Sequence, residues 1–417
     1  MEAHAQEDRA GDSEAAELAA KLAIYPVARY PVQHATAAFH LATVHLQRGR
    51  VDQAVPLLSD AFETFGRLGM RLEQTKALTM HGVALREGGR NDLAAATFER
   101  AAQAFSELEQ PAEEAAASYN LGLSLAQHGD LGAVRDALTR AHELFLEEGH
   151  LAQAGAAARE LGAHLLTSGE IGAALAVLED AAALAQRAGD LPGLGAAANA
   201  LGLAHLANDD SEAAVREFVR AVGAYPRGLR ARDHAMVKAN LAVAHERDGN
   251  QPRARLAARQ ALAIANADPL VLDQALELLD RLSGDKQTDL LTVLDQEPAA
   301  SWTAILREEV LRWCEASRAE RVRAVHLFIM GLLARPGASY DLAECLVGVM
   351  LELSPIPYEE MVACVVQVTG QLAEPEEERV RAILGSAMAR FAIPQWQRLA
   401  AGLNGAATAV GLPGGWR

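Results

Sequence analysis

The stretch LGAHLLTSGEIGAALAVLEDA, residues 161–181, decides the fold of this chain. It begins with Leu161-Gly162, places Gly169 eight residues after the leucine, and continues with Ala174 and Ala181. The same order of residue types recurs at an interval of 40 residues, without insertion or deletion, in segments that begin at Leu41, His81, Leu121, Leu201 and Leu241. A fixed period of this length predicts an array of stacked structural repeats. Such arrays build extended surfaces that hold partners, and catalysis is not their usual role.

Each repeat has the pattern of two helices joined by a turn. In the first one, apolar residues recur at helical intervals before Gly49 and again after it, from Ala54 to Phe65. Glycine ends the first helix at little cost because it accepts the left-handed backbone conformation. The small residues at the second position of each repeat, such as Gly122 and Gly162, are expected where the two helices cross at close range.

This pattern resembles the tetratricopeptide repeat. The small residue after a leucine, the turn glycine and the two alanines stand in the fourth repeat as Gly162, Gly169, Ala174 and Ala181. The usual repeat of that family has 34 residues, so this one is similar to the extended variant of kinesin light chain and of bacterial regulatory sensor domains. The resemblance covers about residues 36–270 and implies an all-α superhelix. Asp209 departs from the pattern, because it replaces the turn glycine of the fifth repeat.

The resemblance also implies where a partner binds. In this family the first helix of each repeat lines the concave side, and residues four apart on it share a face. An asparagine there can donate to and accept from a peptide backbone at once, and an aromatic ring offers rigid apolar area. The alternative for the asparagines is that they are solvated or cap a neighbouring turn. The expected contact residues are Phe39, Lys76, Thr79, Tyr119, Asn120, Leu123, Arg159, Asn199, Leu203 and Asn240.

One subtype of the family is disfavoured. Members that grip the carboxylate of a chain terminus use lysines and an asparagine at set positions. Only Lys76 fits that arrangement, because the neighbouring clamp positions are Thr79 and Val83, and Tyr119 and Leu123 one repeat later. An amphipathic helix or an extended peptide with apolar anchors therefore suits this surface better.

The repeats do not account for the whole chain. We expect an N-terminal capping helix or degenerate half-repeat over residues 1–35, because residues 12–26 echo residues 210–226. Six repeats and a capping helix fill 36–283, a linker fills 284–298, and an all-helical C-terminal domain fills 299–417. That last part is either a separate domain or a divergent continuation of the superhelix. Its broad apolar faces, such as Phe328 to Leu333, form an internal core or a homodimer surface, and the core is favoured.

The composition limits the classes of partner that the chain is expected to bind. Half of the chain is hydrophobic, only 5% is aromatic, and the formal net charge is −17 without a basic stripe, which argues against nucleic acid. The apolar runs are too short for a membrane span, and the N-terminus lacks a signal pattern. The three cysteines, Cys314, Cys345 and Cys364, show no metal-binding spacing. They are expected to be reduced and buried, which indicates a cytoplasmic protein.

No motif for chemistry stands out. There is no phosphate-binding loop, and Gly193-Leu194-Gly195 lies between helices with no strand before it. His45, His205 and His245 share one repeat position and are therefore expected in a row of packing residues, without a shared metal ion. No catalytic residue, cofactor or metal is predicted. We therefore expect a scaffold or adaptor that binds a peptide or partner protein. The alternatives are a ligand- or peptide-responsive regulator and, less favoured, an enzyme or an accessory subunit that uses the C-terminal domain.

Overall fold

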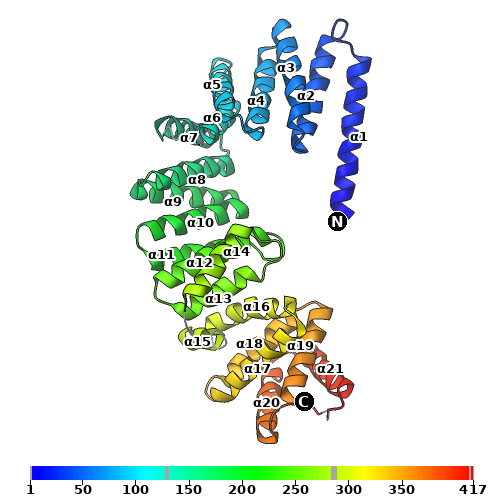
Figure 1. The fold of residues 1–417 in the computed structure, drawn as a ribbon, viewed down its shortest axis with the longest axis vertical. Helices are drawn as coiled ribbons and strands as arrows, with labels where there is room; N and C mark the ends of the chain where they lie inside the picture. The colour runs from blue at the N-terminus through cyan, green and yellow to red at the C-terminus, as the bar shows by residue number, and fades with distance from the viewer. Residues whose placement is uncertain (1, 127–130, 283–288, 413–414, 417) are drawn as a thin grey trace. The chain divides into compact units, whose positions relative to one another are not determined.

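The structure is a computed structural model that describes residues 2–126, 131–282, 289–412 and 415–416. Within these residues every regular element is an α-helix, as the sequence predicts (Figure 1). Contacts divide the chain into two compact units, Met1–Asp210 and Ser211–Arg417, which are termed the N-terminal unit and the C-terminal unit. The helices of the N-terminal unit are α1 (Glu2–Ile24), α2 (Pro31–Gln47), α3 (Val51–Arg67), α4 (Arg71–Glu87), α5 (Asn91–Glu107), α6 (Pro111–Leu125), α7 (Leu131–Glu147), α8 (Leu151–Thr167), α9 (Ile171–Ala188) and α10 (Leu191–Ala207). Those of the C-terminal unit are α11 (Ser211–Ala224), α12 (Ala231–Arg247), α13 (Gln251–Leu262), α14 (Pro269–Arg281), α15 (Asp289–Gln296), α16 (Ala299–Glu315), α17 (Arg318–Ala334), α18 (Ser339–Glu352), α19 (Pro355–Thr369), α20 (Glu374–Met388) and α21 (Ile393–Ala409).

The 40-residue interval is visible in the helices themselves. The first helices of the six repeats start at Pro31, Arg71, Pro111, Leu151, Leu191 and Ala231. The second helices start at Val51, Asn91, Leu131, Ile171, Ser211 and Gln251. From α1 to α10, and again from α11 to α14, the chain therefore runs through antiparallel helices in which consecutive helices pack on one another.

The turns between the paired helices have the backbone that the glycines predict. The φ angle is +65° at Gly49, +80° at Gly169 and +78° at Gly249. Asp209, which replaces the glycine, still takes a φ of +56°. Gly129 lies outside the described residues. A left-handed backbone strains any residue other than glycine. Because Asp209 adopts it nevertheless, we infer that the packing of the two flanking helices sets the shape of this turn.

Close approach of the paired helices explains the small residue after each leucine. A Cβ added at Gly122 would lie 2.6 Å from Leu138, and one added at Gly162 would lie 2.5 Å from Leu178. Both leucines are almost fully buried. The predicted reason for the small residues is thus confirmed at these two crossings, since the space of a side chain is taken by the partner helix.

The N-terminal helix α1 stands where the second helix of a repeat would stand. It packs on α2 and ends at Ile24, 200 residues before α11 ends at Ala224. The turns that follow are alike: a ring nitrogen of His34 lies 2.8 Å from the carbonyl oxygen of Tyr25, and His234 makes the same contact with Tyr225 at 2.8 Å. The echo between these two stretches of sequence therefore reflects a shared turn structure.

Packing changes beyond the repeats. In the C-terminal unit α16 packs on α18 and α18 on α20, while α17 packs on α19 and α19 on α21. Consecutive helices of this region touch less than these alternate ones do. Residues 299–417 therefore do not continue the packing of the repeats, although they belong to the same compact unit as α11 to α14.

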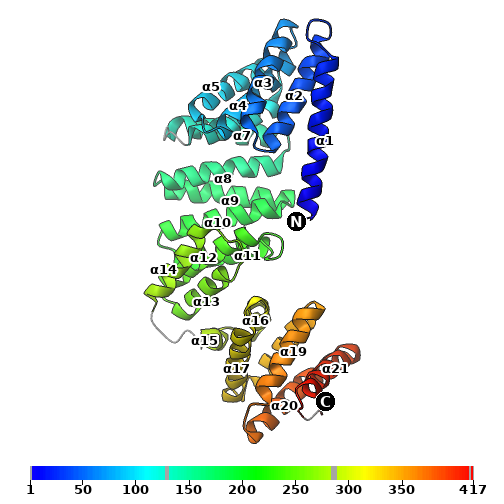
Figure 2. The same ribbon diagram turned by 45° about the vertical axis from the view of Figure 1, so that its right-hand side comes forward.

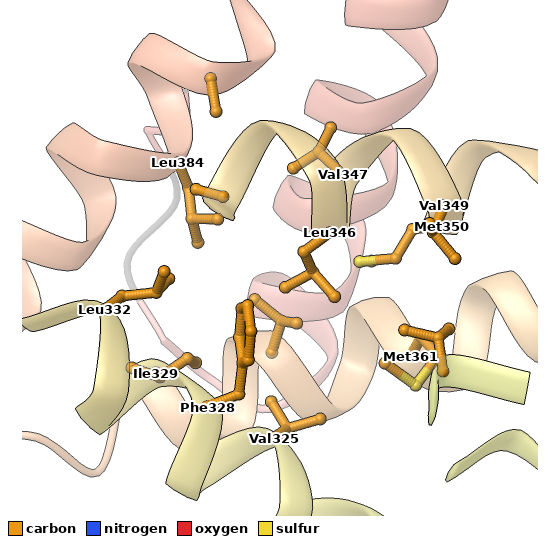
Figure 3. Close-up of a cluster of buried hydrophobic side chains, with 14 of the residues drawn as sticks. Val325, Phe328, Ile329, Leu332, Leu346, Val347, Val349, Met350, Met361 and Leu384 are labelled. Carbon is orange, nitrogen blue, oxygen red and sulfur yellow. The ribbon is translucent and has the colours of Figure 1, made fainter. Parts of the chain in front are cut away.

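The apolar faces of this region form a core. Phe328 and Leu332 of α17 point towards Leu346 of α18 and Leu384 of α20 (Figure 3), and all four side chains are buried within the chain. The prediction of an internal core is confirmed for these faces.

The predicted linker over residues 284–298 is wrong over part of its length. Residues 289–296 form α15, and residues 283–288 lie outside the described part of the chain. Asp289 accepts hydrogen bonds from Arg255 Nη2 at 2.7 Å and from Arg259 Nη1 at 2.8 Å. These bonds hold the helix against α13, so that Leu291 and Leu294 are buried. The polar residues before α15 gave the stretch the appearance of a linker.

Two further features bear on function. No helix in the described ranges is both long and apolar enough to cross a membrane. Nowhere in the described part of the chain do three or more His, Cys, Asp or Glu side chains gather as metal ligands would. The cysteines are free thiols, and burial raises the pKa of Cys314 to about 11.

Candidate binding surface

Nine of the ten predicted contact residues lie in the N-terminal unit, all on its even-numbered helices. Phe39 and Thr43 lie one turn apart on α2, and the same two positions recur on each following first helix. Residues four apart share a helix face, so the side chains form two parallel rows. Figure 1 and Figure 2 show α8, α9 and α10 stacked one after another along this unit. The family resemblance predicts that the first helix of each repeat lines the concave side. The inner face is defined as Phe39, Thr43, Thr79, Val83, Tyr119, Leu123, Arg159, Ala163, Asn199 and Leu203.

The apolar side chains of the inner face are packed against the helices behind them and also keep part of their surface exposed. Phe39 is half-buried and packs on the clusters around Ala38 and Ala42. Tyr119 is half-buried between the clusters that contain Phe145 and Leu161. Leu123 is also half-buried, and Leu203 is 39% exposed. The face therefore offers fixed apolar side chains, each with part of its surface open to a partner.

Tyr119 is held as a neutral phenol. Burial raises its pKa, and the nearby Glu160 carboxylate acts in the same direction, against a smaller opposite effect of Arg159. Arg159 Nη2 donates to Glu160 Oε1 at 2.6 Å, so these two charges compensate each other. A neutral phenol in this position can both donate and accept a hydrogen bond.

Asn120 is already engaged within the chain. Its Nδ2 donates to the carbonyl oxygen of Ala116 at 2.8 Å, and its Oδ1 accepts from Arg86 Nη1 at 2.8 Å. One N–H of the amide remains outside these bonds, because the Nδ2 group has two donors. A peptide would have to displace Arg86 to gain the acceptor as well.

The other polar residues of the prediction have internal partners too. Lys76 is exposed and lies 3.8 Å from Glu113, and the Thr79 hydroxyl donates to the Thr75 carbonyl at 3.0 Å. Asn199 is only 9% exposed. Asn240 belongs to α12 in the C-terminal unit, where its Oδ1 accepts from Gln274 Nε2 at 3.4 Å. The nine other predicted residues belong to the N-terminal unit, and Asn240 belongs to the C-terminal unit.

Sequence reasoning missed a buried polar network in the C-terminal unit. Lys238 Nζ donates to Gln260 Oε1 at 2.9 Å, and Gln260 Nε2 donates to Glu309 Oε1 at 2.9 Å. Arg312 Nη2 then donates to Glu309 Oε2 at 2.7 Å. Lys238, Gln260 and Glu309 are each at least nine-tenths buried. The network joins α12 and α13 of the sixth repeat to α16, which follows the repeats.

A signal for this network was present in the sequence. Position 238 is a lysine, whereas the equivalent positions in the other five repeats are occupied by the buried residues Ala38, Leu78, Ser118, Ala158 and Ala198. A charge at a position that is otherwise small or apolar indicates a local partner of opposite charge. That partner comes from α16, outside the repeats, so the period alone did not point to it.

Comparison with known proteins agrees with the repeat architecture. Residues 79–141 and 199–269 match the sequence profile described as "Tetratricopeptide repeat". No curated protein matches the chain. Similar solved structures include BtubC (BKLC) from P. vanneervenii, with 14% identity, 56% of this chain and 94% of that chain covered, and a TM-score of 0.45.

Two other solved structures are similar to the same degree. The apo form of RapI has 14% identity over 60% of this chain and 85% of its own, with a TM-score of 0.43. A Podosopora anserina putative kinesin light chain with nearly identical TPR-like repeats has 18% identity over 45% of this chain and 93% of its own, with a TM-score of 0.40. The sequence profile, the recurring helix pairs and their small-residue crossings agree on one assignment: this chain contains tetratricopeptide repeats, matched by the profile at residues 79–141 and 199–269.

Proposed function

We propose that the N-terminal unit is a scaffold that binds a peptide, or a segment of a partner protein, on its inner face. Repeats of this family generally mediate protein–protein interactions. The observation that carries the proposal is the inner face itself, where half-exposed apolar side chains sit among charges that are already paired within the chain. Tyr119 and Leu123 lie one turn apart at its centre, and the neighbouring Arg159 is paired with Glu160.

This arrangement favours one kind of partner. Because Lys76 is close to Glu113 and Arg159 is paired with Glu160, little free positive charge remains to attract an acidic chain end. Aromatic and aliphatic anchors in a partner would gain more from contact with Tyr119 and Leu123, since buried aromatic contacts dominate most interfaces. The partner is therefore an amphipathic helix or an extended segment with apolar side chains at alternating or helical spacing.

We also propose that the inner face is not catalytic. Its two aliphatic hydroxyl groups, on Thr43 and Thr79, donate to the carbonyl oxygens four residues earlier, at 3.0 Å in both cases. A nucleophilic hydroxyl needs a neighbouring base that takes its proton. These hydroxyls are instead satisfied by the backbone of their own helices.

Selection of displayed peptides against the full chain tests this function. A library of random 12-residue peptides should yield binders rich in aromatic and aliphatic residues. A variant with Tyr119→Ala and Leu123→Ala should bind the selected peptides at least tenfold more weakly, since truncating interface anchors costs more than about 1.4 kcal/mol. Affinity is measured by fluorescence anisotropy of the labelled peptide.

The matched control removes apolar area from the outer helices. Leu93 of α5 is 55% exposed and Leu131 of α7 is 44% exposed, so Leu93→Ala with Leu131→Ala should leave the affinity unchanged. Equal affinity for the wild type and the Tyr119/Leu123 variant would refute the assignment of the inner face. Selection of peptides with free acidic C-termini as their common feature would refute the proposed class of partner.

A further inference from the structure

A cavity in the C-terminal unit lies apart from the inner face. Its volume is about 590 Å³, and its walls come from α11, α12, α13, α15 and α16. Most of the wall is apolar, with Val219 and Val222 from α11, Leu256 from α13, Val293 from α15 and Ile305 from α16. This size falls within the range of pockets that bind drug-sized ligands, about 300–1,000 Å³.

One end of the cavity is lined by polar groups that make fewer hydrogen bonds than they could. Lys238 is only 6% exposed, and its ammonium has three donors, of which one is used by Gln260 at 2.9 Å. Glu308 Oε2 lies 3.6 Å from Lys238 Nζ and 3.4 Å from His234 Nε2. Both separations exceed the usual hydrogen-bond distance, and this buried oxygen has no hydrogen-bond partner. A buried donor and a buried acceptor therefore stand side by side with bonding capacity to spare.

A second unsatisfied group lines the same cavity. His245 is 6% exposed, belongs to the cavity wall, and its Nδ1 has no hydrogen-bond partner. Burial lowers its pKa to about 4, helped by the charges of Arg253 and Lys238. Its ring is thus neutral near pH 7, and a neutral ring nitrogen can accept or donate one bond according to its tautomer.

The charges around the cavity balance. Lys238 is opposed by Glu308, Arg253 by Glu297, and Arg307 by Glu352, whose Oε2 lies 2.7 Å from the guanidinium Nε. A ligand with a net charge would leave one charge uncompensated in a partly buried site, which is costly. A neutral ligand avoids that cost.

We propose that this cavity binds a neutral amphiphile whose head group carries a carbonyl oxygen beside an N–H, such as a secondary amide with an alkyl chain. The carbonyl accepts from Lys238, the N–H donates to the Glu308 carboxylate, and the chain lies against Val219, Leu256 and Ile305. Each part of this molecule matches a feature of the wall. The site is separate from the inner face and its occupancy does not depend on the function proposed there.

A series of ligands with one chain and different heads tests the proposal. The full chain is titrated calorimetrically with N-methyldecanamide, methyl decanoate and decanoate. The amide should bind most tightly. The ester lacks the N–H and the carboxylate repels Glu308, so each should bind about tenfold more weakly, the effect of one lost charge-assisted hydrogen bond. Absence of amide binding, or equal binding of all three heads, would overturn the proposal.

Variants locate the site. Ala304 is exposed at the wall of the cavity on α16, so Ala304→Trp blocks the space without leaving a buried charge unpaired. It should weaken amide binding at least tenfold with unchanged helical content. Ala319→Trp, at an exposed position of α17 outside the cavity, should leave binding unchanged, as should the Tyr119/Leu123 variant. Wild-type affinity in Ala304→Trp would place the amide elsewhere and refute this site.

Discussion

Gly162 is packed so closely that its lack of a side chain sets the spacing of two helices. A Cβ at this position would lie 2.5 Å from Leu178 Cγ, so Gly162→Ala should lower the free energy of unfolding by roughly 1–3 kcal/mol, the usual cost of overpacking. The sixth repeat holds Ala242 and Ala258 at the two equivalent positions. Gly162→Ala combined with Leu178→Ala reproduces that pair.

The double variant is the control for this explanation. Leu178→Ala alone leaves a cavity, and the added methyl at residue 162 fills part of it. The loss in the double variant, measured by urea denaturation, should therefore be smaller than the sum of the two single losses by about 0.5 kcal/mol or more. Strict additivity would show that the two side chains do not compete for the same space.

His245 predicts a pH dependence of stability. Its folded-state pKa is lowered to about 4 by burial, whereas an unfolded histidine titrates near about 6.5. The unfolded state therefore binds the proton more readily, so this contribution is complete above the unfolded pKa and is lost as the pH falls from about 6.5 towards 4.

The measurement compares the wild type with His245→Gln between pH 7 and pH 4.5. Stability of the wild type should fall more steeply, with the extra slope approaching about 1.4 kcal/mol per pH unit at most. The other histidines with lowered pKa values, His45 and His81, are present in both proteins and cancel in the difference. Parallel pH profiles would exclude His245 as the cause.

Helix turns differ in strain from one repeat to the next. Glu109 follows α5 with a φ of +53°, while Gly149 occupies the equivalent place after α7 with a φ of +76°. Replacing Glu109 by glycine should raise the free energy of unfolding by about 0.5–1 kcal/mol, because the left-handed backbone strains any residue with a Cβ. Gly149→Ala should lower it by a similar amount. Thermal unfolding followed by circular dichroism checks both, and changes of equal sign would contradict this explanation.

One buried carboxylate on helix α15 binds two arginines of α13. Asp289 is 1% exposed and accepts hydrogen bonds from both Arg255 and Arg259. Asp289→Asn leaves these cations without a counter-charge, so it should destabilise the C-terminal unit by roughly 3–5 kcal/mol. Asp295 on the same helix is exposed and pairs with Arg335 at 2.6 Å. Asp295→Asn is the control, with an expected loss below about 1 kcal/mol. Equal losses in chemical denaturation would show that burial does not set the strength of these pairs.

Across the whole molecule, the sequence predicts regular packing much better than polar contacts. The 40-residue period predicted the paired helices and their turns, because small residues recur at the same helix crossing in each repeat. The hydrogen bond between Asn120 and Arg86 could not be predicted, because Arg86 lies 34 positions away on a neighbouring helix and the repeat pattern contains no rule for such a bond.

The region after the repeats was predictable as helices but not in its packing. Breaks such as Arg335-Pro336-Gly337 separate the end of α17 from the start of α18. No recurring small residue marks which helix packs on which, so the contacts between alternate helices could not be inferred. The same holds for Lys238 and Glu308, which come from α12 and α16 and meet only through the fold. The polar contacts of this region therefore could not be predicted from the repeat period.

Photocrosslinking tests the central claim, binding on the inner face, most directly. Benzoylphenylalanine is placed in the full chain at Thr79 on the inner face or at Leu93 on the outer helix α5, and each protein is irradiated with the tightest-binding selected 12-residue peptide. The account predicts a covalent adduct from position 79 and little from position 93. Adducts from position 93 alone, or equal yields from both, would contradict it.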